Sequence, residues 1–351
     1  MSQSTVLDIV QDSLGYMWFA TMDGLNKYDG YKFYSYKIDE NNPKAISSQY
    51  IRKLFIDHKG TLLVGGNRGI SRYKFTTDEF KNYNVLNSAV DSYVSGIMVD
   101  QENLIWISTY SGKLLCYNEK LDLFDEIKYK STEDNPRAIE AIELKDSLIY
   151  IGTEYGLYQY STQSNYLDKI QIEGKDPSIR AIKHDARYGY WIGTDDDGLY
   201  LLGNNDEVIK HFVNRLSHNN QIIDNFVRDI DIDEFGNIWI GTINGLSIFN
   251  PKNNVFRNYS ENSNDNFALS HNSIRSVFSD ADGGIWLGTY YGGLSYYHAD
   301  NIVFNLINQN SGNFSLNDNV ISVIKEDKKG NLWIGPVAFF KYLNNILVFH
   351  L

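Results

Sequence analysis

The chain has 351 residues, of which 42% are hydrophobic and 22% charged, a composition typical of a soluble globular protein rather than a disordered one. Its formal net charge is −12 and it contains no run of Lys or Arg. This argues against nucleic acid or an anionic membrane as the main partner, because both require a basic surface.

One phrase recurs along the chain, D-x-x-G-x-x-W-I-G-T-x-x-G-L-x-x-Y, with its central residue repeating every 41 to 48 positions. In chain order the copies are Asp12–Tyr28, Asp57–Tyr73, Asp100–Tyr117, Asp146–Tyr160, Asp185–Leu202, Asp233–Phe249, Asp280–Tyr297 and Asp327–Tyr342. All six tryptophans occupy the central position, and Leu63 and Tyr150 occupy it in the second and fourth copies. Such a period indicates a repeat architecture.

Each copy predicts four short strands. The first is largely apolar and precedes the Asp, as in residues 274–278. The D-x-x-G segment predicts a hairpin turn, in which an Asp such as Asp233 bonds its own backbone and a Gly such as Gly236 takes positive φ. The second strand holds the tryptophan, the third follows the second Gly, and the fourth is a short aromatic segment such as residues 255–259.

Small antiparallel sheets of this kind bury both faces only when they stack around an axis, so the chain is predicted to be an all-β propeller of four-stranded antiparallel blades. Helical solenoids are disfavoured because glycine, β-branched and aromatic residues dominate each repeat. The eighth copy departs from the phrase, with Pro336 after the Trp-Ile-Gly run. Seven blades then form a propeller in residues 1–310, and residues 311–351 hold a degenerate eighth blade that lies outside this ring. A closed eight-bladed ring is the alternative.

The I-W-I-G-T-x-x-G-L phrase resembles the two-component regulator propeller repeats of hybrid sensor histidine kinases from Bacteroidetes. The resemblance implies paired seven-bladed propellers in the periplasm, followed by a β-sandwich, one membrane helix and cytoplasmic kinase and regulator domains. The preference for seven blades over eight rests on this resemblance, which also implies that residues 311–351 are the start of the second propeller. It also implies that the ectodomain senses oligosaccharides, and that the second propeller and the β-sandwich are partners of this chain. A homodimer is left open.

A periplasmic location rests on that resemblance alone. The chain has no stretch of 18 apolar residues, and residues 1–5 lack the features of a signal peptide.

We expect a ligand on the face that carries the turns between strands 2 and 3 and the linkers between blades, because the D-x-x-G turns of the opposite face are nearly uniform. These turns combine aromatic with polar side chains, as carbohydrate sites do. The candidates are Arg68, Tyr110, Tyr155, Asp195, Asp196, Asn244, Tyr290 and Tyr291. The alternative is that they are solvated turn residues.

A second set of candidates lies on the innermost strand, five residues before the turn Asp. Arginine occupies this slot in four blades, as Arg52, Arg180, Arg228 and Arg275. The slot holds Leu7 and Ser95 in two others, and Glu140 matches it once a shorter hairpin is allowed for. Arginines near the axis would suit a carboxylate or sulfate of an acidic sugar. The alternative is that each ties neighbouring blades together through ion pairs.

Two acidic runs, residues 195–197 and 229–233, resemble calcium ligands, but neither has the Gly and Glu spacing of an EF-hand loop. No metal and no cofactor is therefore expected. The histidines show neither H-x-H nor H-E-x-x-H spacing, and no G-x-S-x-G elbow exists.

His271, in a linker on the predicted ligand face, is the one candidate general base and is counted among the ligand candidates. We expect a non-catalytic ligand-sensing module. The alternatives are a lyase or hydrolase acting on a carbohydrate or a peptide ester, and a protein-interaction propeller.

Overall fold

The computed structural model describes residues 1–85, 92–131, 136–215, 220–262, 268–298, 321–328, 332–336 and 341–343. The chain divides into two compact units, Met1–Ala299 and Asp300–Leu351. The predicted boundary between residues 310 and 311 lies outside the described residues. Within these ranges the regular secondary structure is entirely β, and no helix has the length and hydropathy needed to span a membrane.

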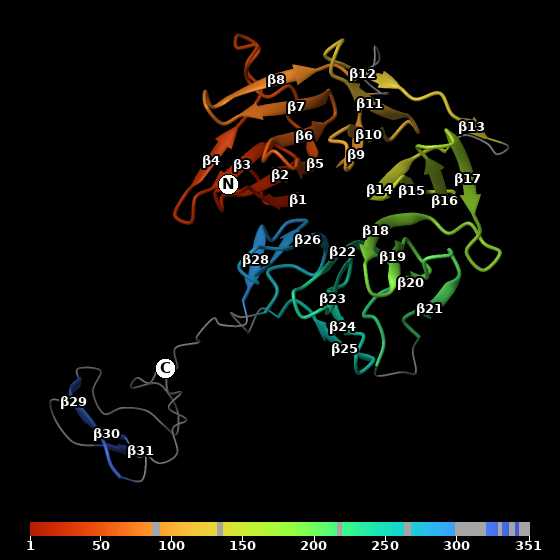
Figure 1. Ribbon diagram of the computed structural model, residues 1–351. Coiled ribbons are helices and arrows are strands. Elements are labelled where there is room, and N and C mark those ends of the chain that lie inside the picture. Colours follow the sequence, from red (N-terminus) through yellow and green to blue (C-terminus); the bar gives the residue numbers. More distant parts are fainter. Residues whose placement is uncertain are drawn as a thin grey trace. The chain divides into compact units, whose positions relative to one another are not determined.

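Seven sheets, which we call blades 1 to 7, make up the first unit (Figure 1). Blade 1 comprises β1 (Val6–Gln11), β2 (Met17–Thr21), β3 (Gly24–Tyr28) and β4 (Phe33–Tyr36). Blade 2 comprises β5 (Ile51–Ile56), β6 (Leu62–Gly66), β7 (Gly69–Lys74) and β8 (Glu79–Tyr83). Blade 3 comprises β9 (Val94–Val99), β10 (Ile105–Thr109), β11 (Leu114–Asn118) and β12 (Leu123–Glu126). Blades 4 and 5 are β14 (Ile139–Lys145), β15 (Leu148–Thr153), β16 (Gly156–Ser161) and β17 (Tyr166–Ile170); β18 (Ile179–Asp185), β19 (Gly189–Thr194), β20 (Leu199–Leu202) and β21 (Val208–Phe212). Blades 6 and 7 are β22 (Val227–Ile232), β23 (Ile238–Thr242), β24 (Leu246–Asn250) and β25 (Val255–Tyr259); β26 (Ile274–Ser279), β27 (Ile285–Thr289) and β28 (Leu294–Tyr297).

Within each blade the strands pair antiparallel in sequence order, as predicted. Blade 4 gains a short outer strand, β13 (Lys130–Ser131), parallel to β17. Blade 7 has three strands in the described residues.

The ring closes with seven blades. The innermost strands lie around a common centre in Figure 1, each one contacts the next, and β1 contacts both β5 of blade 2 and β26 of blade 7. The prediction of a seven-bladed propeller is thereby confirmed, and the eight-bladed ring is not formed.

The second unit contains one three-stranded antiparallel sheet of β29 (Ile321–Glu326), β30 (Leu332–Pro336) and β31 (Lys341–Leu343). Its strand order is that of the first three strands of a blade, and it coincides with the eighth copy of the phrase. The partial eighth blade is thus present as a separate sheet.

The D-x-x-G turns are held by the bonds that the sequence predicts and by one more. In blade 1 the Oδ1 atom of Asp12 accepts hydrogen bonds from the backbone N–H groups of Leu14 and Tyr16, both at 3.0 Å, and Gly15 has a φ of 83°. The Oδ2 atom of Asp12 accepts the indole N–H of Trp18 at 2.7 Å. The equivalent bond recurs in blades 3, 5, 6 and 7 at 2.8 to 3.3 Å, so the Asp and Trp of the phrase depend on each other.

The central aromatic side chains pack between adjacent blades. Trp18 of blade 1 packs with Leu54 and Val64 of blade 2. At the closure, the ring of Trp286 in blade 7 lies 5.6 Å from that of Phe19 in blade 1. Burial of one such side chain stabilises the fold by roughly 1.5–3 kcal/mol, so these contacts are a main source of cohesion between blades.

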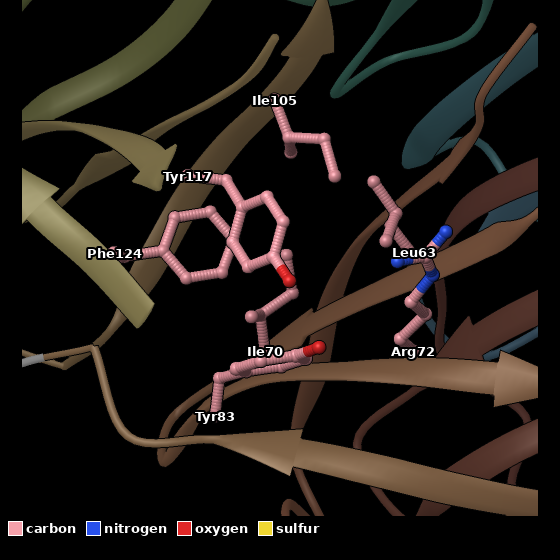
Figure 2. Close-up of a pocket in the computed structure, with 7 residues that line it drawn as sticks. All are labelled: Leu63, Ile70, Arg72, Tyr83, Ile105, Tyr117 and Phe124. Atoms are coloured by element: carbon pink, nitrogen blue, oxygen red, sulfur yellow. The ribbon is translucent and has the colours of Figure 1, made fainter. Parts of the chain in front are cut away.

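Blade 2 is the exception, because Leu63 occupies the tryptophan position. A small pocket is present beside this leucine, between blades 2 and 3 (Figure 2). The pocket is lined by Leu63, Ile70, Arg72, Tyr83, Ile105, Tyr117 and Phe124. We attribute it to the smaller side chain, which fills less of the space between these blades than an indole would.

Candidate ligand-binding site

The predicted arginine slot is a β-bulge in every blade of the ring. On each innermost strand the pairing register shifts by one residue at this slot, which leaves that residue outside the ladder. We call the seven residues the axial ring: Leu7, Arg52, Ser95, Glu140, Arg180, Arg228 and Arg275. A bulge re-aims a side chain, and bulges are common beside functional sites.

Two arginines of the axial ring are paired with carboxylates. Glu140, only 5% exposed, forms ion pairs with Arg52 and with Arg180. Arg180 also makes a bidentate contact with Asp195, with Nε–Oδ1 and Nη2–Oδ2 distances of 2.5 and 2.7 Å. Blades 2 and 4 are not neighbours, so the contact between Arg52 and Glu140 passes blade 3, whose residue in the axial ring is the small Ser95. Arg180 thus forms the expected ion pair between neighbouring blades, whereas Arg52 is paired with a blade that is not its neighbour.

These contacts also change the protonation equilibrium of Arg180. Burial alone would lower the pKa of its guanidinium, but the bonds to Asp195 and the charge of Glu140 outweigh burial and raise it. Arg52 and Arg180 are thus both stabilised as cations by their carboxylate partners.

The other two arginines have no such partner. Among the described residues neither Arg228 nor Arg275 forms an ion pair, and the Nε atom of each is buried without a hydrogen bond. The guanidinium of Arg228 lies 4.9 Å from the ring of Phe226, and that of Arg275 lies 4.7 Å from the ring of Tyr290. Burial, followed by the charges of Arg275 and Arg180, lowers the pKa of Arg228 to about 10. Burial likewise lowers the pKa of Arg275.

Aromatic residues that precede the innermost strands also face the axial ring, and the sequence reasoning missed them. The Arg52 guanidinium lies 5.5 Å from the Tyr93 ring and donates a hydrogen bond to its hydroxyl. The ring of Tyr50 lies 5.8 Å from that of Tyr93. Burial raises the pKa of Tyr50 to about 12. Tyr50, Tyr93 and Phe226 all stand two residues before the axial position, a periodic signal that could have revealed them.

The predicted turn residues fall into two groups. In blades 3, 4, 5 and 7 the first residue of the turn contacts the axial ring or one of its partners: Tyr110 donates to Glu154 at 3.0 Å, Glu154 lies 3.7 Å from Arg180, Asp195 binds Arg180, and Tyr290 stacks on Arg275. The second residue is exposed in blades 2, 4, 5, 6 and 7, as Arg68, Tyr155, Asp196, Asn244 and Tyr291, whereas Ser111 of blade 3 is half-buried. Ligand contact by either group stays a prediction.

His271 is half-buried beside this face. Its Nδ1 atom accepts a hydrogen bond from the backbone N–H of Ser273 at 3.0 Å, and its ring lies 6.2 Å from that of Tyr291. One ring nitrogen is therefore occupied by the local turn.

The acidic run at 229–233 connects blades 6 and 7. The Asp229 carboxylate accepts the backbone N–H of Val277 at 2.8 Å, and Asp231 accepts that of Ser279 at 2.7 Å. Burial raises the pKa of Asp229 to about 6, against the opposing charge of Lys53. In the described ranges no three His, Cys, Asp or Glu side chains are grouped to hold a metal ion.

Comparison with known proteins identifies the repeat. Residues 221–244, 268–291 and 315–337 match the family described as two component regulator propeller. These three segments of the chain are thus similar to two component regulator propeller repeats. The resemblance inferred from the I-W-I-G-T-x-x-G-L phrase is thus confirmed. In blades 6 and 7 the matched repeat runs from the linker to the turn between strands 2 and 3, so it includes the axial arginine, the D-x-x-G turn and the tryptophan.

Individual proteins with these repeats or this fold are similar over different lengths. A histidine kinase from Formosa agariphila is 52% identical over 48 residues, which are 14% of this chain and 3% of the kinase. The extracellular domain of a hybrid two component system from B. thetaiotaomicron has a TM-score of 0.70 and 23% identity, covering 99% of this chain and 52% of that domain. This chain therefore spans about half of that extracellular domain.

A catalytic propeller has the same fold. Virginiamycin B lyase from Staphylococcus aureus has a TM-score of 0.65 and 12% identity, covering 83% of this chain and 94% of the lyase. At such identities both structural likenesses bear on the fold alone.

Proposed function

We propose that this propeller is the extracytoplasmic ligand-sensing module of a hybrid two-component sensor. The observation that carries the proposal is the match of three segments to two component regulator propeller repeats, together with the structural likeness of 99% of this chain to about half of an extracellular domain of such a system. In this proposal the complete protein adds a second propeller, beginning in residues 311–351, a β-sandwich, a membrane helix and the kinase domains. The second propeller and the β-sandwich are then its partners, and homodimerisation is a further possibility to test.

We also propose that the ligand is an oligosaccharide bound at the axial ring. Tyr50, Tyr93 and Tyr290 offer ring faces that suit the apolar faces of sugars, and the arginines beside them offer planar donors for hydroxyl or acidic groups. The arginines occupy the bulged positions, and the three tyrosines come from blades 2, 3 and 7, which are distant in sequence.

Calorimetric titration of the chain with neutral and acidic oligosaccharides tests this proposal. We expect at least one to bind with a measurable heat, and the substitution Tyr290→Ala to weaken it by roughly tenfold, as the loss of a stacked aromatic contact does. Tyr259→Ala, on the exposed outer strand β25, is the matched control and should bind normally. Binding that survives Tyr290→Ala and the corresponding changes at Tyr50 and Tyr93 would contradict an axial site.

The lyase alternative is favoured only by the shared propeller fold. Incubation of the same oligosaccharides with the chain, followed by mass spectrometry, separates sensing from catalysis. Intact sugars are expected if the module only senses, and shortened or unsaturated products would identify an enzyme.

A further inference from the structure

We propose that Arg228 and Arg275 form a binding site for one anionic group of the ligand, a carboxylate or a sulfate ester. This inference deepens the proposed function and rests on it only for the sugar part of the ligand. The two residues occupy the same bulge position on β22 and β26, the innermost strands of adjacent blades that contact each other.

The stacking of both arginines leaves their donors available. A guanidinium that lies over an aromatic ring uses its face for that contact and keeps the N–H groups at its edge free to bind oxygen atoms in its plane. Phe226 and Tyr290 provide these rings, at 4.9 and 4.7 Å. A planar carboxylate or a sulfate matches such an edge with two parallel hydrogen bonds.

The carboxylates near this pair are engaged elsewhere. Asp195 is bound by Arg180, and Asp229 accepts the backbone N–H of Val277 in the neighbouring blade. Asp224, in the linker before β22, accepts the N–H of Phe226 and the amide of Asn244. Two half-buried guanidinium groups with orphan Nε atoms therefore remain next to each other without a described counter-ion.

Such an arrangement disfavours the empty protein and favours a bound anion. Buried like charges repel, and a buried donor without an acceptor loses its hydration without compensation. An anion relieves both effects at once. Among the described residues, the ion pairs at the axial ring join Arg52 and Arg180 to Glu140, Glu154 and Asp195, and they leave Arg228 and Arg275 without a carboxylate.

The test compares matched acidic and neutral probes. By calorimetry, trigalacturonate and galactose 6-sulfate are titrated against galactotriose and galactose, and the melting temperature is measured in sodium sulfate and in sodium chloride at equal ionic strength. The variants are Arg228→Gln, Arg275→Gln, the double variant, and Arg257→Gln on the exposed outer strand of blade 6 as the control. The carboxylate and sulfate arms distinguish the two kinds of anion.

In the unmodified chain we expect the preferred acidic probe to bind about tenfold or more tightly than its neutral counterpart, and sulfate to raise the melting temperature above that in chloride. The double variant should lose both the preference for the acidic probe and the stabilisation by sulfate. Without ligand, its melting temperature should equal or exceed that of the unmodified chain. The control should keep both differences. Each single variant should weaken the acidic probe by about tenfold.

The inference is overturned if acidic and neutral probes bind alike and sulfate acts like chloride, or if the double variant retains the preference. If galactotriose binds equally well to the unmodified chain and the double variant, the anion site fails while the oligosaccharide proposal stands. If the rise in melting temperature with sulfate depends on the two arginines but no oligosaccharide binds, the anion site stands and the oligosaccharide proposal fails.

Discussion

The two faces of the propeller satisfy their polar groups in different ways. On the face with the D-x-x-G turns, the turn Asp bonds groups of its own repeat: the Asp12 carboxylate accepts two backbone N–H groups and the indole N–H of Trp18. On the opposite face, the charged groups of one blade are paired with groups of other blades. Arg52 needs Glu140 from two blades away, and Arg228 and Arg275 have no carboxylate partner among the described residues.

This difference shows which face of the fold has polar groups that are not paired within the described part of the protein. A repeat that is complete in itself can be copied around the ring without adjustment, which explains why its sequence is nearly uniform. A face on which the same position is Leu, Arg, Ser or Glu is free to vary, and its unsatisfied groups are the candidates for function rather than for stability. The predictions below test this division by changing one face at a time.

The largest effect is expected from removing the carboxylate that bridges the paired arginines. Glu140→Gln leaves Arg52 and Arg180 without their shared counter-ion, and the free energy of unfolding should fall by roughly 3 kcal/mol, as for other buried ion pairs that lose one member. Denaturant unfolding measures the change. Glu154→Gln is the control, because this residue is 33% exposed and 3.7 Å from Arg180, and it should change stability by less than about 1 kcal/mol. Equal effects of the two changes would contradict a bridging role for Glu140.

On the turn face we expect a smaller loss from the bond between Asp and Trp. Asp12→Asn keeps one oxygen for the turn but directs an amide toward the buried indole N–H of Trp18, so stability should fall by about 2 kcal/mol. Asp57→Asn makes the same change in blade 2, where Leu63 provides no indole, and should alter stability by less than about 0.5 kcal/mol. Chemical denaturation of both variants gives the comparison, and neither should affect ligand binding.

A gain is expected where the turn face is incomplete. Leu63→Trp in blade 2 should fill the pocket shown in Figure 2 and donate to the Asp57 carboxylate, stabilising the protein by about 1 kcal/mol. Leu63→Phe adds a ring without the donor, so it should recover only part of that gain. Thermal unfolding distinguishes them. A tryptophan that performs no better than phenylalanine would mean that the indole bond contributes nothing in this blade.

The fold was predictable because its signal is periodic. Spacing and turn chemistry indicated four-stranded blades, and residues 255–259, expected as an outer strand, are β25 as observed. The number of blades was predicted from the family resemblance, because the sequence itself contains eight copies of the phrase. The same periodicity located the arginine slot. Periodicity could not show that this slot is a β-bulge, because a one-residue shift in pairing register has no mark in the sequence.

The partners of the axial arginines were not predictable for a different reason. The ion pair between Arg52 and Glu140 joins strands 88 positions apart across the ring, so it depends on ring curvature rather than on any local pattern. The first and second turn residues also looked equivalent in sequence. They differ because a backbone hydrogen bond orients the first one, as from Tyr290 N–H to the Ser273 carbonyl at 3.0 Å.

The smallest effect on stability, with a large effect on binding, is expected from giving the unpaired side the chemistry of the paired side. Tyr290 corresponds to Asp195, since both donate their backbone N–H to the residue just before the innermost strand at 3.0 Å and both contact the arginine of their own blade. Tyr290→Asp should supply Arg275 with a carboxylate, and the new ion pair should offset the lost stacking to within about 1 kcal/mol.

The same change should abolish the preference for acidic over neutral sugars, because the introduced carboxylate occupies the donors that an anion would use. Calorimetry with trigalacturonate and galactotriose measures this preference. Tyr259→Asp adds the same charge on the outer strand β25 and should leave it intact. If the preference survives Tyr290→Asp, the donors of Arg275 do not determine it, and the donors of Arg228 alone would have to account for it.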